Sequence, residues 1–421
     1  MLLLLAACTP TPVVGNPELL HTALAFDLEN LEGTAEIDLL APEATTAVAL
    51  EVGDLEILQV KVEGEETATE QRAGLLAVPT TPGENQTIFV RYSFFTHENY
   101  TGWGPTRGES FTWPSYCGNL FPCNSELEDG ASYSMQLRGV PRQKTAVYPS
   151  EIPAEAPAYT PAFVVGDYTD TVLGRTPAGT QLHVWTRPGE LEAMLDGTSR
   201  LVQSFGFLEE TYGPYTFGDQ AGSVSVEWGE EYGGMENHPY WHISGMALRS
   251  QEVHTHEAAH GWFGTGVRFA CWEDFVLSEG TTSYISGRAL EEVGGPDLFD
   301  TYVDELDLFC GTDEDVRALP DTCNEIDITT DPLWSMVPYM KGACFYEDVA
   351  DQIGIARMDG IIAAFYQTHV GKAARMEDML DAIRSELSPA EEGPFEQRVQ
   401  DWLLSPHCPT DYAERCGKHG N

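Results

Sequence analysis

His256-Glu257-Ala258-Ala259-His260, followed by Glu279-Gly280, is the stretch that decides the fold of this chain. Histidines four residues apart lie on one face of a helix, one turn apart, where both rings can bind the same metal ion. Eighteen residues separate His260 from Glu279, enough for one helix to end and a second to return past the metal. Two neutral histidines and one carboxylate leave zinc an open fourth position, as in catalytic sites. We therefore expect His256, His260 and Glu279 to bind one Zn²⁺, and Glu257 to take a proton from its water.

Four motifs occur around this stretch in a fixed order. They are Gly233–Asn237 (Gly-Gly-Met-Glu-Asn), Trp262–Gly264 (Trp-Phe-Gly), Trp272–Gly280 and Val337–Gly342 (Val-Pro-Tyr-Met-Lys-Gly). Together they resemble the aminopeptidase N family of zinc metallopeptidases, which includes the leukotriene hydrolase branch. The resemblance covers roughly residues 20 to 405. It implies a zinc-dependent aminopeptidase that removes N-terminal residues from peptides.

The resemblance also implies individual roles. Glu257 is expected to be the general base, and Tyr339 to donate its hydroxyl to the oxyanion of the tetrahedral intermediate. Glu236 is expected to bind the free α-amine of the substrate, since a buried carboxylate needs a cation. The expected substrate-binding strand consists of Gly233, Gly234, Met235, Glu236 and Asn237. Asp331, eight residues before Tyr339, either faces the substrate pocket or belongs to an ordinary Asp-Pro turn.

Four further polar residues near the expected ligands are not expected to bind the metal themselves. We expect His242 and His254 to be surface or supporting residues and not ligands, and Glu273 or Asp274 to orient a zinc histidine. Many family members also place a Gln before the Phe-Pro-Cys turn, whereas this chain has Phe111–Tyr116 (Phe-Thr-Trp-Pro-Ser-Tyr). Two other functions therefore stay open: a zinc endopeptidase with an open cleft, and a weakly active surface lipoprotein that binds peptides.

The first eight residues, Met1–Cys8, form an apolar run that ends in Leu-Ala-Ala-Cys. This pattern resembles the lipobox of bacterial lipoproteins, and it predicts a lipid anchor at Cys8 and export to the bacterial cell envelope. No Lys or Arg precedes the run, so we expect that either the charged n-region is truncated or the start codon is misassigned. Thr9–Pro12 (Thr-Pro-Thr-Pro) then reads as an extended tether.

The cysteine count agrees with export. Without Cys8, eight of the nine cysteines remain, and an even number in an exported chain suggests disulfides. Short spacings favour three pairs and leave a fourth: Cys117–Cys123, Cys310–Cys323, Cys408–Cys416 and Cys271–Cys344.

The charge is extreme, with 67 acidic residues against 22 basic ones and a formal net charge of −45. This balance disfavours binding to nucleic acid or to an anionic membrane through a basic patch. It suits a marine or halophilic environment, where salt screens the repulsion between acidic groups.

The apolar pattern predicts an α+β chain. Residues 18–186 alternate apolar and polar positions between Gly, Pro and Asn breaks, which predicts an N-terminal β-rich domain, saddle-like by the resemblance. Residues 187–406 show helical spacing and resemble the family's thermolysin-like catalytic domain. We expect residues 1–8 to be a signal segment, 9–17 a tether and 407–421 a tail. The helical domain that roofs the cleft in many relatives has no counterpart here, so an open cleft is expected.

Overall fold

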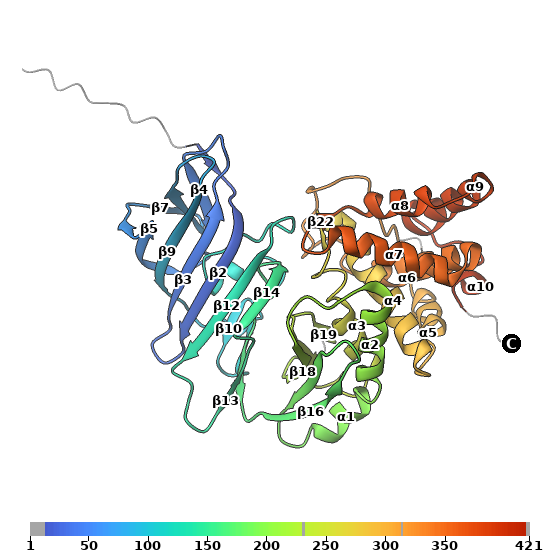
Figure 1. The fold of residues 1–421 in the computed structure, drawn as a ribbon, viewed down its shortest axis with the longest axis horizontal. Helices are drawn as coiled ribbons and strands as arrows, with labels where there is room; N and C mark the ends of the chain where they lie inside the picture. The colour runs from blue at the N-terminus through green and yellow to red at the C-terminus, as the bar shows by residue number, and fades with distance from the viewer. Residues whose placement is uncertain (1–12, 230–231, 313–314, 418–421) are drawn as a thin grey trace, which may run out of the picture.

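The computed structural model describes residues 13–229, 232–312 and 315–417. A β-rich part and a largely helical part lie side by side (Figure 1). The helical part contains a five-stranded sheet and a two-stranded one made of β21 (Arg268–Phe269) and β22 (Ala373–Ala374). The α+β class and the order of the two parts agree with the sequence prediction.

The β-rich part contains a seven-stranded sheet in the order β14-β12-β2-β3-β9-β5-β6. In β3, Ala35, Ile37 and Leu39 are fully buried while the residues between them are not, because successive side chains point to opposite faces of a strand. The strands are β2 (Glu18–Asp27), β3 (Glu32–Leu40), β5 (Glu56–Val62), β6 (Glu65–Glu66), β9 (Asn85–Ser93), β12 (Ala131–Arg138) and β14 (Glu151–Ala156).

Two four-stranded sheets complete this part. The first, in the order β1-β4-β8-β7, shares the core of the large sheet, and the second, β10-β11-β15-β13, approaches the helical part. Their strands are β1 (Val14–Gly15), β4 (Ala47–Glu51), β7 (Glu70–Arg72), β8 (Leu75–Pro79), β10 (Gly102–Gly104), β11 (Glu109–Phe111), β13 (Thr145–Val147) and β15 (Val164–Gly166).

The second part begins with a five-stranded sheet in the order β16-β17-β18-β20-β19. Its three central strands are parallel, and six of the seven residues of β18 are buried, as expected when both faces of a parallel strand are covered. The strands are β16 (Thr169–Arg175), β17 (Gln181–Thr186), β18 (Gln220–Val226), β19 (Gly234–Met235) and β20 (Tyr240–Ser244). The short edge strand β19 carries the Gly-Gly-Met-Glu-Asn motif.

Helices α3 (Gln251–Ala259), α4 (Phe275–Glu292) and α6 (Val337–Ile353) form the centre of the helical part. Gly280 of α4 faces Gly342 of α6, where a Cβ atom on either glycine would lie 2.5–2.7 Å from the Cα of the other. Only glycine permits this backbone contact, which brings the start of α6 against α4. The remaining helices are α1 (Leu191–Gly197), α2 (Leu201–Tyr212), α5 (Leu298–Leu306), α7 (Ile355–His369), α8 (Met376–Ser385), α9 (Pro389–Arg398) and α10 (Tyr412–Cys416).

Three expected boundaries differ from the structure. β16 and β17 pair with the second sheet, so this sheet begins at Thr169 and not after residue 186. Val14 and Gly15, expected in the tether, pair with Ala47 and Val48 of β4. The expected tail contains α10, whose Cys416 is buried. Each difference arises from pairing with residues distant in the sequence, which local patterns do not report.

Only one of the four expected disulfides is present. Cys117–Cys123 is confirmed, whereas Cys310–Cys323, Cys408–Cys416 and Cys271–Cys344 are wrong. The observed bonds are Cys271–Cys323, Cys310–Cys408 and Cys344–Cys416. The error follows from pairing by short spacing, because the C-terminal segment lies against α5 and α6 and supplies one cysteine to each region.

The expected lipid-anchor residue Cys8 and the tether residues 9–12 lie outside the described residues. Among the helices of the described ranges, none combines the length and the apolar character that crossing a membrane requires.

Candidate metal centre and substrate cleft

Three side chains converge on one point: His256 from α3, His260 from the C-terminal end of α3, and Glu279 from α4. His256 Nε2 lies 3.1 Å from Glu279 Oε2, His260 Nε2 lies 3.3 Å from the same oxygen, and the two Nε2 atoms are 3.1 Å apart. Ligand atoms bound at about 2.0–2.1 Å to a tetrahedral zinc lie about 3.3 Å from one another. The three atoms therefore fit three corners of a zinc site, and the fourth corner faces a cavity that these residues line.

The local sequence explains how α3 presents its histidines. The helix begins at Ser250, whose side chain accepts a hydrogen bond from the Val253 N–H, and it ends at His260. The chain then reverses through Gly264, which has a φ of 94°, and a Cβ atom there would lie 2.5 Å from His260 Nδ1. The Trp-Phe-Gly motif thus ends with a residue that must be glycine.

Hydrogen bonds on the far side of each ring orient the ligands. His260 Nδ1 lies 3.0 Å from the carbonyl oxygen of Phe263, which holds the proton on Nδ1 and leaves Nε2 free to bind a metal. His256 Nδ1 lies 3.5 Å from Ser283 Oγ. Sequence reasoning missed Phe263 and Ser283 in this role, since a backbone carbonyl leaves no signal in the sequence.

The charges of the three groups suit a cation. Burial alone would raise the pKa of Glu279, but His260 and His256 lower it to about 2, so the carboxylate is ionised. Burial lowers the pKa of His256, which favours the neutral imidazole that a metal needs. Burial also disfavours charge on His260, yet Glu279 and Glu236 raise its pKa to about 10. The surrounding carboxylates thus favour a positive charge at this point of the site.

Glu257 projects from α3 toward the edge strand β19. It is buried, and its pKa is raised by burial and by the neighbouring Glu236 and Glu279. A Cβ atom on Gly234 would collide with the Glu257 carboxylate, so glycine at this position makes room for it. A carboxylate with a raised pKa beside a metal is suited to accept and return a proton.

Glu236 follows β19 directly and belongs to the same cluster, because a carboxylate oxygen of Glu236, one of Glu257 and a ring nitrogen of His260 all lie within 4.8 Å of one another. The hydroxyl of Tyr159 donates to Glu236 Oε1 at 2.8 Å. Sequence reasoning missed Tyr159, since it lies in the β-rich part outside every motif. Its hydroxyl lies beside the carboxylate expected to bind the amine, in a chain whose residues 111–116, ahead of the Phe-Pro-Cys turn, contain no glutamine.

Asn237 and His238 hold the motif strand in place. The side-chain amide of Asn237 donates to the carbonyl oxygens of Tyr159 and Thr160, and Asn237 does not line the cavity. His238 bridges the Tyr215 hydroxyl, 2.8 Å away, and the backbone carbonyl of Glu257, 2.9 Å away. Burial lowers the pKa of His238 to about 3, so it is neutral and supports structure.

Tyr339 lies in the first turn of α6, with its ring stacked on His256 at 5.7 Å between centroids. Burial and the nearby Glu279 and Glu236 raise its pKa well above the usual value, so the hydroxyl stays protonated. Lys341, in the same motif, turns away from the cavity and donates to the carbonyl oxygens of Val316 and Ser405. Of the Pro-Tyr-Met-Lys-Gly motif, Tyr339 and Met340 line the cavity, while Lys341 and Gly342 serve packing.

The cavity beside the cluster has a volume of about 340 Å³. Gly233, Gly234, Met235 and Glu236 form one side, and α3 forms another. Its apolar walls are large side chains from four segments: Trp113, Tyr232, Phe275, Trp334, Met336 and Met340. It can therefore hold a short extended peptide beside the edge strand.

Asp331 does not line this cavity, so the pocket-facing alternative for it is corrected. Its carboxylate accepts a hydrogen bond from the Leu333 N–H at 2.8 Å, which is ordinary turn chemistry. His254 and His242 are both buried, not at the surface, and lie outside the metal cluster. His254 joins Ser223 to the carbonyl of Leu248.

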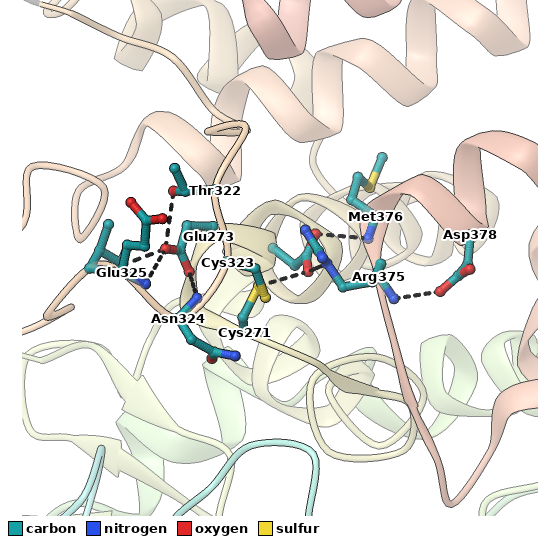
Figure 2. Close-up of a disulfide and its surroundings, with 11 residues drawn as sticks. Cys271, Glu273, Thr322, Cys323, Asn324, Glu325, Arg375, Met376 and Asp378 are labelled. Atoms are coloured by element: carbon teal, nitrogen blue, oxygen red, sulfur yellow. Dashed lines mark hydrogen bonds and ion pairs between the residues drawn. A yellow bond between two sulfur atoms is a disulfide. The ribbon is translucent and has the colours of Figure 1, made fainter.

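Glu273 and Asp274 do not orient a zinc histidine, which corrects a further expectation. Glu273 accepts hydrogen bonds from the backbone amides of Asn324, Glu325 and Ile326, next to the Cys271–Cys323 disulfide (Figure 2). Asp274 pairs with Arg375 and accepts a hydrogen bond from the Met376 N–H. Both residues attach other segments to the start of α4, because two adjacent buried carboxylates need several donors each.

Comparisons with known proteins show which family this chain resembles. Residues 231–402 match the peptidase family M1 domain. Leucine aminopeptidase 2 of Emericella nidulans is 27% identical over 59% of this chain and 41% of its own length. Leucine aminopeptidase 2 of Candida albicans is 23% identical over 87% of this chain and 66% of its own length. The chain thus spans less than two thirds of each relative, and the expected resemblance to the aminopeptidase N family is confirmed.

Solved structures show the same fold. An M1 zinc metallopeptidase from Deinococcus radiodurans superposes with a TM-score of 0.77 at 17% identity, over 94% of this chain and 95% of that one. Leukotriene A4 hydrolase from Saccharomyces cerevisiae superposes with a TM-score of 0.76 at 20% identity, over 94% of this chain and 69% of that one. At such identities the likeness concerns the fold alone.

Proposed function

Since this chain carries a peptidase family M1 domain over residues 231–402, we propose that it is a zinc-dependent aminopeptidase that removes single residues from the free N-terminus of peptides. The position of Glu236 carries this proposal. Its carboxylate lies in one cluster with Glu257 and His260, beside the metal ligands. One residue of an extended chain spans about 3.3–3.6 Å, so a peptide whose amine reaches Glu236 has its first peptide bond at the cluster.

Zinc held by His256, His260 and Glu279 would polarise the scissile carbonyl and lower the pKa of the attacking water toward about 7. Glu257 then accepts the proton of the water and returns it to the leaving amine. The Tyr339 hydroxyl donates to the oxygen on which negative charge develops. Glu236, held by the Tyr159 hydroxyl, fixes the substrate amine.

Solved relatives support the substrate class. M1 zinc metallopeptidase structures contain bound L-arginine and L-tryptophan, and one from Deinococcus radiodurans contains a Tyr-Ser-Ala substrate. The curated relatives are named leucine aminopeptidase 2 and aminopeptidase B. Amino acids and short peptides are therefore the ligands to test first.

A peptide series with free and with acetylated N-termini tests the proposal. We expect the full chain, purified with zinc, to cleave only the free form. Glu236→Gln should reduce kcat/KM by about 10²-fold or more, since it removes a buried charge-assisted bond. Glu227→Gln, at an exposed glutamate on the preceding segment, is the matched control. Equal cleavage of both peptide forms would establish an endopeptidase, and zinc binding without cleavage would favour a peptide-binding protein.

We further propose that Cys8 carries a lipid anchor at the bacterial cell envelope. The Leu-Ala-Ala-Cys sequence and the eight paired cysteines of the remaining chain support export. Metabolic labelling with a fatty acid should mark the wild type but not Cys8→Ala. Equal labelling of both would reject the anchor.

A further inference from the structure

Glu252 is an acidic residue in the cavity to which the proposed reaction assigns no role. It lies on α3 one turn before His256, and it lines the cavity together with Val253, His256 and Glu257. A helix rises 1.5 Å per residue, so Glu252 lies about 6 Å along α3 from His256 and about 12 Å from His260. Glu236 clusters with Glu257 and His260, toward the opposite end of this helix.

The edge strand defines the two ends of the cleft. A Cβ atom on Gly233 would lie 3.8 Å from the Val253 side chain, whereas one on Gly234 would meet Glu257. Strand β19 and helix α3 therefore run in the same direction, with Gly233 near the start of α3 and Glu236 near its end. β19 is the last strand of its sheet, so its outer edge can pair with an extended peptide.

This arrangement sets the direction of a bound peptide. If Glu236 holds the amine, the first residue occupies the end near His260, and the chain leaves past the metal toward Gly233. The side chain of the second residue then comes closest to the first turn of α3. Glu252 is the acidic side chain that lines this end of the cavity.

The Glu252 carboxylate has no cationic partner among the described residues. Arg249, just before α3, pairs with Asp196 and Glu192, and Arg200 donates to Gln251. Burial and the acidic Glu305 of α5 both raise the pKa of Glu252, which means that a cation beside it would be stabilised.

We propose that Glu252 selects peptides with lysine or arginine at the second position, whose cationic side chain it binds while the first peptide bond is cleaved. This inference rests on the proposed aminopeptidase function. It goes beyond that function because it assigns the selection of the substrate's second side chain to Glu252.

Kinetics on matched peptides test the assignment. The probes are Leu-Lys-Ala-Ala, Leu-norleucine-Ala-Ala and Leu-Glu-Ala-Ala, which differ only in the second side chain. For the wild type in low salt, we expect kcat/KM for lysine to exceed that for norleucine by about tenfold, as one partly buried charge-assisted bond provides. Salt at about 1 M should reduce this ratio, because it screens the charge.

Two variants and one control make the result specific. Glu252→Gln should bring the lysine-to-norleucine ratio to about one, and Glu252→Lys should favour the glutamate peptide. Glu227→Gln, at an exposed glutamate outside the cavity lining, should keep the wild-type ratio. Each ratio is internal to one protein, so a loss of folded material does not affect it. Equal cleavage of the lysine and norleucine peptides by the wild type overturns the inference but leaves the aminopeptidase function intact. No cleavage of any probe overturns the aminopeptidase function itself.

Discussion

At the scale of single residues, the cluster of candidate metal ligands was predictable from the sequence, and the residues that support it were not. His256 and His260 follow from a spacing of four on one helix, and Glu279 from its fixed distance along the chain. Tyr159 and the carbonyl of Phe263 contact the site through tertiary packing, and no local pattern reports them. Of the two alternatives for Asp331, the pocket-facing one is wrong, because its carboxylate completes a turn outside the cavity.

Tyr339 provides a test of catalysis at this scale. Tyr339→Phe keeps the ring that stacks on His256 and removes only the hydroxyl. Loss of one oxyanion donor should lower kcat about 10²- to 10³-fold and leave KM nearly unchanged. Steady-state kinetics with zinc content measured in parallel would check this. A fall in zinc content, or a change confined to KM, would contradict the assigned role.

Glu347 provides a test of stability against pH. It is buried in α6, its Oε2 has no hydrogen-bond partner among the described residues, and burial with the nearby Asp351 raises its pKa to about 7. An unfolded glutamate has a pKa of about 4.3, so between about pH 4.3 and 7 the folded chain binds one proton more than the unfolded chain. This group therefore lowers stability as pH rises through that window.

Glu347→Gln should remove that dependence. We expect the variant to be more stable than the wild type by about 1–3 kcal/mol at pH 8, and the difference to vanish near pH 4. Urea unfolding of both proteins across this range measures it. A difference that grows toward low pH would show that the sign is wrong.

At the scale of elements, two glycines decide how the catalytic helices meet. Gly342→Ala would place a Cβ atom 2.5 Å from the Cα of Gly280, and backbone cannot yield cheaply. We expect this change to destabilise the protein by at least about 2 kcal/mol and to reduce activity, because α4 carries Glu279 and α6 carries Tyr339.

Gly360→Ala is the matched control for that change. Gly360 lies in α7 with open space around its would-be Cβ atom. Alanine there should be neutral or stabilising by up to about 1 kcal/mol. Thermal unfolding of both variants distinguishes the cases, and equal stability would argue against a required glycine contact.

Another element-scale feature is the attachment of the segment between α5 and α6. The Cys271–Cys323 bond and the amide contacts of Glu273 hold this segment to the start of α4 (Figure 2). The same segment continues to Trp334 and Met336, which line the cavity. The Cys271–Cys323 disulfide therefore helps to position cavity-lining residues as well as to stabilise the protein.

At the scale of the whole molecule, the net charge of −45 predicts a dependence on salt. Repulsion between acidic side chains opposes the compact state, and salt screens it with a Debye length of about 10 Å at 0.1 M and 3 Å at 1 M. The Tm should therefore rise between about 0.05 and 1 M NaCl. Scanning calorimetry measures this, with sucrose of equal osmolality as the control. A Tm that falls with NaCl would contradict the interpretation.

The sequence by itself predicted the class of the fold, the order of its two parts and the three residues that the structure brings together as a candidate metal cluster. These features depend on spacing within one helix, on alternation within one strand, or on motifs in register, and all are local. Tertiary structure alone decided three of the four disulfides, the start of the second sheet at Thr169, the Tyr159 contact to Glu236 and the end of the cleft that Glu252 lines. Each of these features depends on which segments, distant in the sequence, pack together. The packing is determined by the apolar surface that the whole chain buries on folding.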